Sequence, residues 1–259
     1  MENYQICRVA IAPLRKEPSD RSEIVSQLLF GDRVKVIEQT EKWWLVQNFD
    51  DGYEGWMDFK QLAKLSEAQY SDSHAYRYLA PAAVNNTLVA ANGSAYYVPT
   101  GCALPFYANG FCFLGEEKFE VKFDAWMPNR QSIATELEAT ARFFENAPYL
   151  WGGRTLFGID CSGFVQTVFR LHSLQLKRDA SQQAEQGELV DFLSGATVGD
   201  LAFFDNEAGQ ITHVGMMLGN DKIIHAAGKV RIDPIDGQGI FNPELGRYTH
   251  KLRIIKRFF

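Results

Sequence analysis

The 259-residue sequence lacks several features that mark common classes of protein. It contains no apolar run near the roughly 20 residues that a membrane-spanning helix needs. Its four cysteines form no CxxC pair, which disfavours a zinc ribbon or a thioredoxin-type site. An HExxH motif, typical of zinc peptidases, is also absent. We therefore expect neither a metal nor another cofactor.

The beginning of the chain lacks the features of a secretory signal, which has a basic start and an apolar run of roughly 7–15 residues. Glu2 and Arg8 interrupt this region, and its apolar stretch 9–14 is short. We therefore expect a cytoplasmic protein. Trimming of the chain would hide a removed signal, in which case the protein would be secreted.

The charge balance is acidic, with a net charge of −6 and a pI of about 5.4. That sign disfavours nucleic acid or an anionic membrane surface as the main partner. Hydrophobic residues make up 46% of the chain and charged residues 22%, which is typical of a soluble globular protein. The length favours about two domains, and no feature indicates an oligomeric state.

Residues 1–65 show the pattern of a small all-β domain. Turn signals at Phe30-Gly31-Asp32 and at Asp50-Asp51-Gly52 separate β-rich segments. This spacing favours a small barrel. The expected strands are Ile24–Leu29, Arg33–Glu38, Trp43–Gln47 and Gly55–Met57.

Residues 66–127 predict a linker followed by a second, degenerate β barrel. Residues 66–80 are polar and without a clean period, so they fit either a helix or a linker. Cys102 and Cys112 are either buried small side chains or partners across a hairpin. Glycines punctuate the expected strands, which are Thr87–Ala90, Ala95–Val98, Leu104–Tyr107, Phe111–Leu114 and Phe119–Val121.

Residues 128–259 predict an α+β domain, with helices first and a sheet after them. Apolar positions in Ile133–Phe144 recur at helical spacing. The segments that follow carry the chemically informative residues.

Cys161 has the surroundings of a reactive cysteine. Asp160 is a good N-cap, and an apolar i, i+4 stripe begins at Phe164, so a helix should start at Cys161. The helix dipole would then favour the thiolate, which is the form that attacks carbonyl carbons. On spacing alone, a buried structural cysteine fits equally well.

Two histidines supply a candidate base and an orienting partner for it. His213 begins a buried strand, and His225 lies in the next strand, after a turn at Gly219-Asn220-Asp221. In a hairpin centred on Gly219, the two imidazoles would lie opposite each other on one face. One ring would then hold the tautomer of the other. A shift of one residue would place them on opposite faces.

A metal site is the competing interpretation of His213 and His225. Zinc accepts cysteine and histidine together, and the third ligand would have to be Cys161 or an aspartate. The position of Cys161 at a helix start favours a free thiolate instead. The other histidines, His74, His172 and His250, have no comparable surroundings.

Four motifs occur in a fixed order along the last domain: Tyr149-Leu150-Trp151-Gly152-Gly153, Asp160-Cys161-Ser162-Gly163-Phe164, His213-Val214-Gly215 and Ile224-His225-Ala226. In this combination they resemble the NlpC/P60 family of cysteine peptidases. The resemblance implies a papain-like fold, circularly rearranged, with cysteine ahead of histidine. It implies that Cys161 is the nucleophile, His213 the base and His225 the third, orienting residue.

The N-terminal domain resembles a bacterial SH3 (SH3b) domain. Gly31-Asp32 before a strand, Trp43-Trp44, and the segment from Gly52 to Trp56 stand where that family places them. Together the two resemblances imply a γ-D-glutamyl–diamino acid peptidase that recycles free peptidoglycan stem peptides. Such enzymes release L-Ala-γ-D-Glu from peptides with a free N-terminal L-alanine, and their first SH3b domain closes one end of the cleft. The diamino acid, meso-diaminopimelate or lysine, stays open.

The resemblance also implies substrate contacts. The Tyr149 hydroxyl would join the Cys161 backbone N–H at the oxyanion. The substrate ammonium group needs a carboxylate or other polar partner, for which Asp160, Glu17 and Tyr53 are the candidates. The D-Glu portion would meet Trp151, Ser162, Arg178 and Asp179. The family often has Arg-Asp-Ser where this chain has Arg178-Asp179-Ala180-Ser181.

Other functions stay open at this point. A secreted hydrolase of intact peptidoglycan would use SH3b domains as wall-binding modules. An amidase or acyltransferase would fit the same fold. A non-catalytic wall-binding protein is disfavoured, because Cys161, His213 and His225 are all present.

Overall fold

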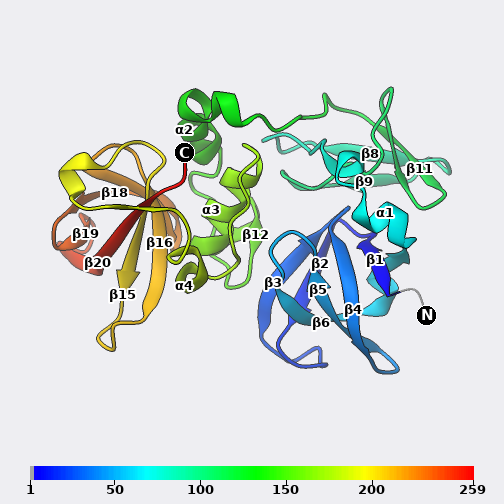
Figure 1. The fold of residues 1–259 in the computed structure, drawn as a ribbon, viewed down its shortest axis with the longest axis horizontal. Helices are drawn as coiled ribbons and strands as arrows, with labels where there is room; N and C mark the ends of the chain where they lie inside the picture. Colours follow the sequence, from blue (N-terminus) through cyan, green and yellow to red (C-terminus); the bar gives the residue numbers. More distant parts are fainter. Residues whose placement is uncertain (1–2) are drawn as a thin grey trace. The chain divides into compact units, whose positions relative to one another are not determined.

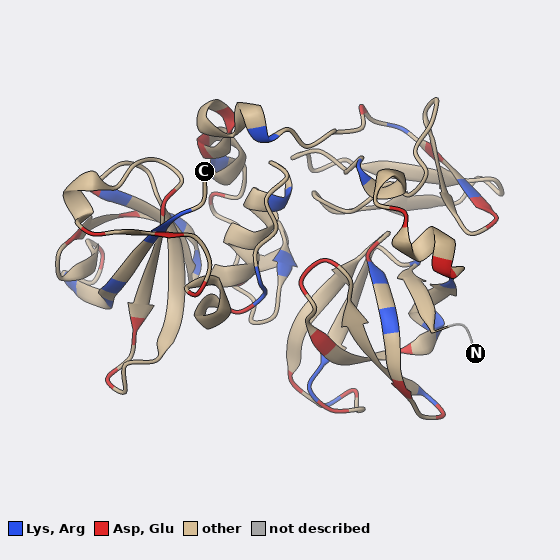
Figure 2. Ribbon diagram, in the orientation of Figure 1, with Lys and Arg blue, Asp and Glu red and all other residues tan. Residues whose placement is uncertain are grey.

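The computed structural model describes residues 3–259, and the chain forms two compact units, residues 1–128 and 129–259 (Figure 1). Acidic and basic residues are interspersed along the strands and loops of both units (Figure 2). Within residues 3–259, no helix is both long enough and apolar enough to cross a membrane.

The first unit begins with a seven-stranded antiparallel sheet in the order β3-β2-β6-β5-β4-β1-β7. Inward-facing residues such as Ala12, Leu14, Val34 and Val36 alternate with more exposed ones and form its core. The all-β architecture expected here is confirmed. The strands are β1 (Tyr4–Cys7), β2 (Ile11–Arg15), β3 (Ile24–Leu29), β4 (Arg33–Gln39), β5 (Trp43–Asn48), β6 (Glu54–Asp58) and β7 (Leu62–Lys64).

A four-stranded antiparallel sheet in the order β10-β11-β8-β9 completes the first unit. Its strands are β8 (Thr87–Ala90), β9 (Ala95–Tyr97), β10 (Phe111–Leu114) and β11 (Glu117–Val121). The short helices η1 (Phe59–Gln61), α1 (Glu67–Ser71) and η2 (His74–Tyr76) precede it. Cys102 and Cys112 are both buried thiols.

The strand expected at Leu104–Tyr107 is wrong. Phe106 has a left-handed backbone with φ 53°, which interrupts an extended segment. The backbone N–H of Leu104 instead donates to the carbonyl of Tyr78, and that of Phe106 donates to the carbonyl of Ala75. The segment is therefore an ordered loop that is tied to the linker before it.

The second unit has its helices first and its strands last, as expected. The helices are η3 (Arg130–Ser132), α2 (Ile133–Phe143), α3 (Cys161–Arg170), α4 (Ala180–Gln183) and η4 (Leu193–Gly195). The strands are β12 (Arg154–Thr155), β13 (Gly158–Ile159), β14 (Glu188–Val190), β15 (Leu201–Asp205), β16 (Ile211–Met217), β17 (Lys222–Ala227), β18 (Lys229–Asp236), β19 (Gly239–Asn242) and β20 (Arg247–Arg257).

Six of these strands close into a barrel, because β20 pairs with β15 on one side and with β19 on the other. Side chains on the outer face of β16 and β17, such as Val214 and Ile224, share an apolar cluster with residues of α2 and α3. The two helices lie on one side of the barrel (Figure 1). Alternate residues point inward, where Phe204, Met217 and Ile223 form a second apolar cluster. Odd-numbered positions of β16 and β17 therefore face the barrel interior.

Replacement of Gly31 by alanine should destabilise the first unit more than replacement of Gly93. Both glycines have a positive φ, 81° and 83°, so alanine costs about 1 kcal/mol at either position. A Cβ at Gly31 would lie 2.5 Å from the carbonyl oxygen of Ala103, whereas a Cβ at Gly93 would meet nothing within 4 Å.

Urea unfolding should therefore show an additional loss of about 1–3 kcal/mol for Gly31→Ala. Equal losses in the two variants would show that the close approach of Gly31 to Ala103 contributes nothing to stability.

Candidate active site

Cys161 is the first residue of α3, as the sequence predicts. Asp160 has an extended backbone, and its carboxylate accepts a hydrogen bond from the backbone N–H of Gly163 at 2.7 Å. This N-cap satisfies one of the donors that a helix start leaves unpaired. Cys161 is only 6% exposed. The expected nucleophile is therefore held by a capped and buried helix start.

The sulfur of Cys161 lies against β16. The backbone N–H groups of Val214 and Ser162 hydrogen-bond to it. The pairing of β16 with β17 begins at Gly215, opposite His225, so Val214 lies just outside the paired segment. The thiol is thus placed where the two strands separate, beside the residue that follows His213.

His213 and His225 both project into the barrel, but the expected register between them is wrong. His225 lies opposite Gly215 and not opposite His213. The offset is two residues, which keeps both rings on one face. Nε2 of His213 lies 2.9 Å from Nδ1 of His225. Gly215 leaves room for this diagonal contact, because a Cβ there would come within 2.8 Å of the His225 Cβ.

Three residues around these histidines were missed by the sequence analysis. Nε2 of His225 lies 3.0 Å from Oδ2 of Asp233. Arg231 pairs with the same carboxylate, with its Nε 2.8 Å from Oδ2 and its Nη2 3.0 Å from Oδ1. The ring of His250 stacks on that of His213, with centroids 4.0 Å apart.

For two of these three residues, Arg231 and Asp233, the local sequence pattern indicated a position near His225. Arg231 and Asp233 alternate with apolar residues directly after the Gly228 turn, which places them on the same sheet face as His225. His250 offered no such signal. It lies in β20, which is brought beside β16 through pairing with β15, a strand distant in the sequence.

His213, His225 and His250 are also the cluster best able to hold a metal ion among residues 3–259, with ligand atoms within 4.8 Å of one another. The third ligand expected from the sequence was Cys161 or an aspartate. Nitrogens that share a tetrahedral zinc at about 2.0–2.1 Å lie about 3.3 Å apart. The His213 and His225 nitrogens are 2.9 Å apart, which is a hydrogen-bonding distance. The rings would have to separate to accept an ion.

The thiol and the imidazole are both neutral at rest. Burial raises the pKa of Cys161 to about 11, and the Asp160 carboxylate adds to the rise. Burial also holds the pKa of His213 well below its ordinary value, and His225 and His250 disfavour a further positive charge there. Burial of the thiol therefore opposes the thiolate that the helix dipole favours.

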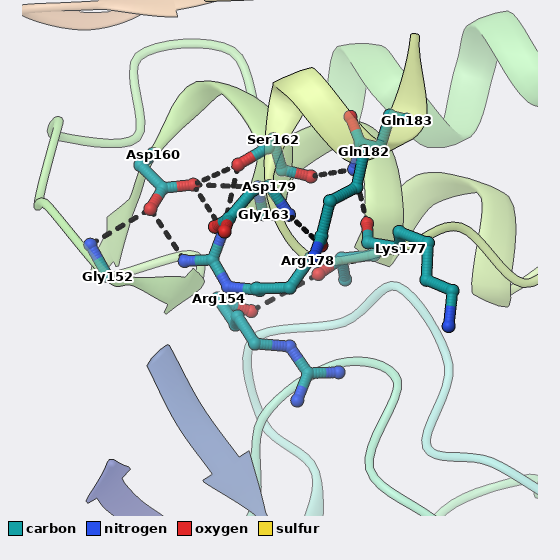
Figure 3. A network of polar contacts seen from close by, with 11 residues as sticks. Gly152, Arg154, Asp160, Ser162, Gly163, Lys177, Arg178, Asp179, Gln182 and Gln183 are labelled. Carbon is teal, nitrogen blue, oxygen red and sulfur yellow. Dashed lines mark hydrogen bonds and ion pairs between the residues drawn. The ribbon is translucent and has the colours of Figure 1, made fainter. Parts of the chain in front are cut away.

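Asp160 and Arg178 form a buried ion pair beside the start of α3 (Figure 3). Nη2 of Arg178 lies 2.6 Å from Oδ2, and Nη1 lies 3.0 Å from Oδ1. The same carboxylate accepts hydrogen bonds from the backbone N–H groups of Gly152 and Gly163 and from the Ser162 hydroxyl. Both oxygens of Asp160 are therefore engaged within the domain.

Ser162 and α4 belong to the same network (Figure 3). The Ser162 hydroxyl accepts a hydrogen bond from Arg178 Nη1 at 2.9 Å. The fully buried Gln183 donates to the carbonyls of Ser162 and Lys177, at 3.1 and 2.7 Å. Asp179 caps α4 in a capping box with Gln182. These contacts hold the segment around Arg178 against α3.

Tyr149 and Trp151 lie in the loop before β12. Burial raises the pKa of Tyr149 to about 12, and charges on Cys161 and Asp160 raise it further. Its hydroxyl therefore stays protonated, as a hydrogen-bond donor in the electrostatic neighbourhood of the thiol. Trp151 is 59% exposed.

Glu17 and Tyr53 belong to the first unit. Tyr53 packs, half-buried, against the core of the seven-stranded sheet. Glu17 is exposed in the loop after β2, and its backbone N–H donates to the Ser22 hydroxyl.

Known protein families match both parts of the chain. The NlpC/P60 family model matches residues 146–246, and the model for the bacterial dipeptidyl-peptidase Sh3 domain matches residues 14–62. A relative from Bacillus subtilis, named gamma-D-glutamyl-L-lysine dipeptidyl-peptidase, is 34% identical over 78% of this chain and 72% of its own length. A Bacillus cereus relative of the same name is 27% identical over 88% and 75%.

Solved structures show the same fold. An NlpC/P60 family protein from Bacillus cereus superposes with a TM-score of 0.82 at 23% identity, covering 98% of this chain and 99% of that one. An NlpC/P60 endopeptidase from Photobacterium damselae subsp. piscicida gives 0.75 at 17% identity, covering 98% and 70%. Together with the family models and the relatives, this fold makes the chain a papain-like cysteine peptidase with an N-terminal bacterial SH3 domain. It belongs to the NlpC/P60 family.

Loss of the Arg178 charge should destabilise the second unit more than loss of a matched surface charge. Arg178→Met leaves the Asp160 carboxylate buried without its counter-ion, which costs about 3–5 kcal/mol. Arg142 pairs with Glu138 at 2.8 Å, and 45% and 39% of these two side chains are exposed. Arg142→Met should therefore cost only about 1 kcal/mol or less. Urea unfolding followed by circular dichroism measures both, and equal losses would contradict burial as the cause.

Alkylation of Cys161 by iodoacetamide should accelerate continuously as the pH rises. With a thiol pKa of about 11, the thiolate fraction increases about tenfold per pH unit below that value. Mass spectrometry of the Cys161 peptide, from about pH 5 to about pH 9, follows the reaction.

Cys161→Ser is the control for the remaining thiols, all of which are 0% exposed: Cys7, Cys102 and Cys112. A rate that is constant above about pH 6 would reveal a preformed thiolate–imidazolium pair and would contradict the neutral resting state.

Proposed function

We propose that this peptidase hydrolyses the γ-D-glutamyl–diamino acid bond of peptidoglycan stem peptides with a free N-terminal L-alanine, releasing L-Ala-γ-D-Glu. The observation that carries the proposal is the placement of Cys161 at a buried helix start, against the backbone of Val214, which follows a His213 that is hydrogen-bonded to His225. The names of the two Bacillus relatives, which match over most of this chain, support the choice of bond.

In the proposed reaction, Cys161 is the nucleophile and His213 is the base. Nε2 of His213 is engaged by His225, so Nδ1 accepts the thiol proton as the sulfur attacks the γ-carbonyl carbon. Because thiol and imidazole are both neutral at rest, proton transfer accompanies attack. The Cys161 backbone N–H and the Tyr149 hydroxyl would stabilise the oxyanion.

Two bond changes then complete the turnover. The C–N bond breaks, and the leaving amine takes the proton from His213, which leaves a thioester on Cys161. Water attacks the thioester carbon while His213 again accepts a proton, and the C–S bond breaks to release the dipeptide acid as the protonated imidazole returns that proton to the sulfur. His225 holds the ring of His213 throughout.

Selectivity for a free N-terminus requires a partner for the substrate ammonium group. Both oxygens of Asp160 already accept hydrogen bonds within the domain, which argues against Asp160 in this role. The proposal retains Glu17 and Tyr53 as candidates. It also places the reaction in the cytoplasm, where free stem peptides are recycled.

The proposal is tested with three substrates: the tripeptide L-Ala-γ-D-Glu-diamino acid, its N-acetylated form, and intact sacculi. We expect cleavage of the free tripeptide alone, because acetylation removes the ammonium charge. The tripeptide is offered with lysine and with meso-diaminopimelate. Chromatography of the released L-Ala-γ-D-Glu measures the activity.

Cys161→Ala should abolish cleavage, and Cys112→Ala, at a buried thiol in the first unit, should not. Cleavage of sacculi, or cleavage of the acetylated peptide at the same rate as the free tripeptide, would contradict the proposal. That outcome would favour a wall hydrolase.

A further inference from the structure

The proposed base stands at the end of a chain of buried polar side chains inside the barrel. Nε2 of His213 meets Nδ1 of His225 at 2.9 Å, and Nε2 of His225 meets Oδ2 of Asp233 at 3.0 Å. The exposures of the three residues are 6%, 1% and 1%. Each contact therefore has a direction, set by which nitrogen carries a proton, and solvent does not compete for it.

We propose that Asp233 is a positioning residue that sets the tautomers of both histidines, so that Nδ1 of His213 is unprotonated and faces the thiol. The inference rests on the proposed function, in which His213 is the base. It assigns a role to a side chain that lies two contacts away from His213.

The direction of the chain follows from the chemistry of the carboxylate. Burial opposes ionisation of Asp233, but the hydrogen bond from His225 and the Arg231 guanidinium together keep its pKa below the ordinary value. An ionised carboxylate only accepts hydrogen bonds, so Nε2 of His225 must donate. In a neutral ring, Nδ1 of His225 is then an acceptor.

The tautomer of His213 follows from that of His225. Because Nδ1 of His225 accepts, Nε2 of His213 must carry the proton. The low pKa of His213 keeps this ring neutral, so it has one proton only. Nδ1 of His213 is therefore left with a free lone pair, as a general base requires.

Arg231 holds the Asp233 carboxylate in position to accept a hydrogen bond from His225. It lies directly opposite His225 in the β17–β18 pair and meets both oxygens of Asp233, while its Nη1 donates to Glu244 at 3.0 Å. The carboxylate is thus held from one side by Arg231 and presented to His225 on the other. When His213 takes the thiol proton, the polarised His225 ring also stabilises the imidazolium.

An amide at position 233 disturbs this arrangement in either orientation. Nη2 of Arg231 donates to Oδ1 and Nε2 of His225 meets Oδ2, so the amide N–H₂ must meet a donor at either place. In the orientation that turns N–H₂ toward His225, Nε2 can no longer donate, and the ring carries its proton on Nδ1 instead. That tautomer drives the proton of His213 onto Nδ1, where it blocks the base.

The test combines kinetics with a direct measurement of tautomers. Asp233→Asn should lower kcat for the free tripeptide by about 10- to 100-fold, with KM changed less than about twofold. Asp236→Asn is the matched control, since Asp236 lies on the same strand but is exposed and bonded to Tyr248. It should leave kcat unchanged.

Two-bond ¹H–¹⁵N spectra of the full chain with labelled histidine report the protonated nitrogen of each ring. In the wild type, His213 and His225 should both carry the proton on Nε2, and Asp233→Asn should shift this distribution. Arg231→Gln, which keeps the carboxylate but removes its clamp, should lower kcat by about 3- to 10-fold and serves if Asp233→Asn does not fold.

A wild-type His213 protonated on Nδ1, or a folded Asp233→Asn enzyme with full kcat, would overturn the inference. The wild-type spectrum decides it without any variant. If the wild type fails to cleave the tripeptide, the proposed function fails instead, and the tautomers still report on the role of Asp233.

Discussion

The buried ion pair between Asp160 and Arg178 determines where the thiol of this peptidase lies. A carboxylate and a guanidinium removed from water are stable only when they are paired and fully hydrogen-bonded. Asp160 meets that requirement because its carboxylate accepts hydrogen bonds from Gly152 in one loop, Gly163 in α3 and Arg178 in the segment before α4. Three separate stretches of chain are thereby fixed around Cys161. The same two charges act in opposite directions on the thiol pKa.

In β16 and β17, the residues that face outward stabilise the fold, and the residues that face inward supply the histidines of the proposed active site. Outward residues of β16 and β17, such as Val214 and Ile224, pack with α3 and hold the helix against the barrel. Inward residues of the same strands are His213 and His225, which enter a polar chain ending at Asp233 and Arg231. The helix that carries the thiol and the strands that carry the base are therefore locked together by one apolar interface.

Much of this arrangement could be predicted from the sequence, because its signals are local. The start of α3 follows from the Asp160 cap and the apolar stripe behind it, and β3 and β8 follow from short apolar runs between turns. The register between His213 and His225 could not be read, because the length of the turn at Gly219 is not encoded by apolar spacing alone. The resting charge of Cys161 could not be read either, since it depends on how deeply the thiol is buried.

The way in which β20 (Arg247–Arg257) closes the barrel has a consequence for folding. It pairs with β14, β15 and β19, and its partners in β15 lie more than 40 positions earlier in the chain, as in the pair Asp205 and Lys251. Contacts of such long sequence separation form slowly, because loop-closure entropy opposes them until the sheet is nearly complete. His250 reaches His213 only through this last closure. The surroundings of the proposed base are therefore complete only when this long-range pairing has formed, so a chain without it lacks an organised hydrolytic centre.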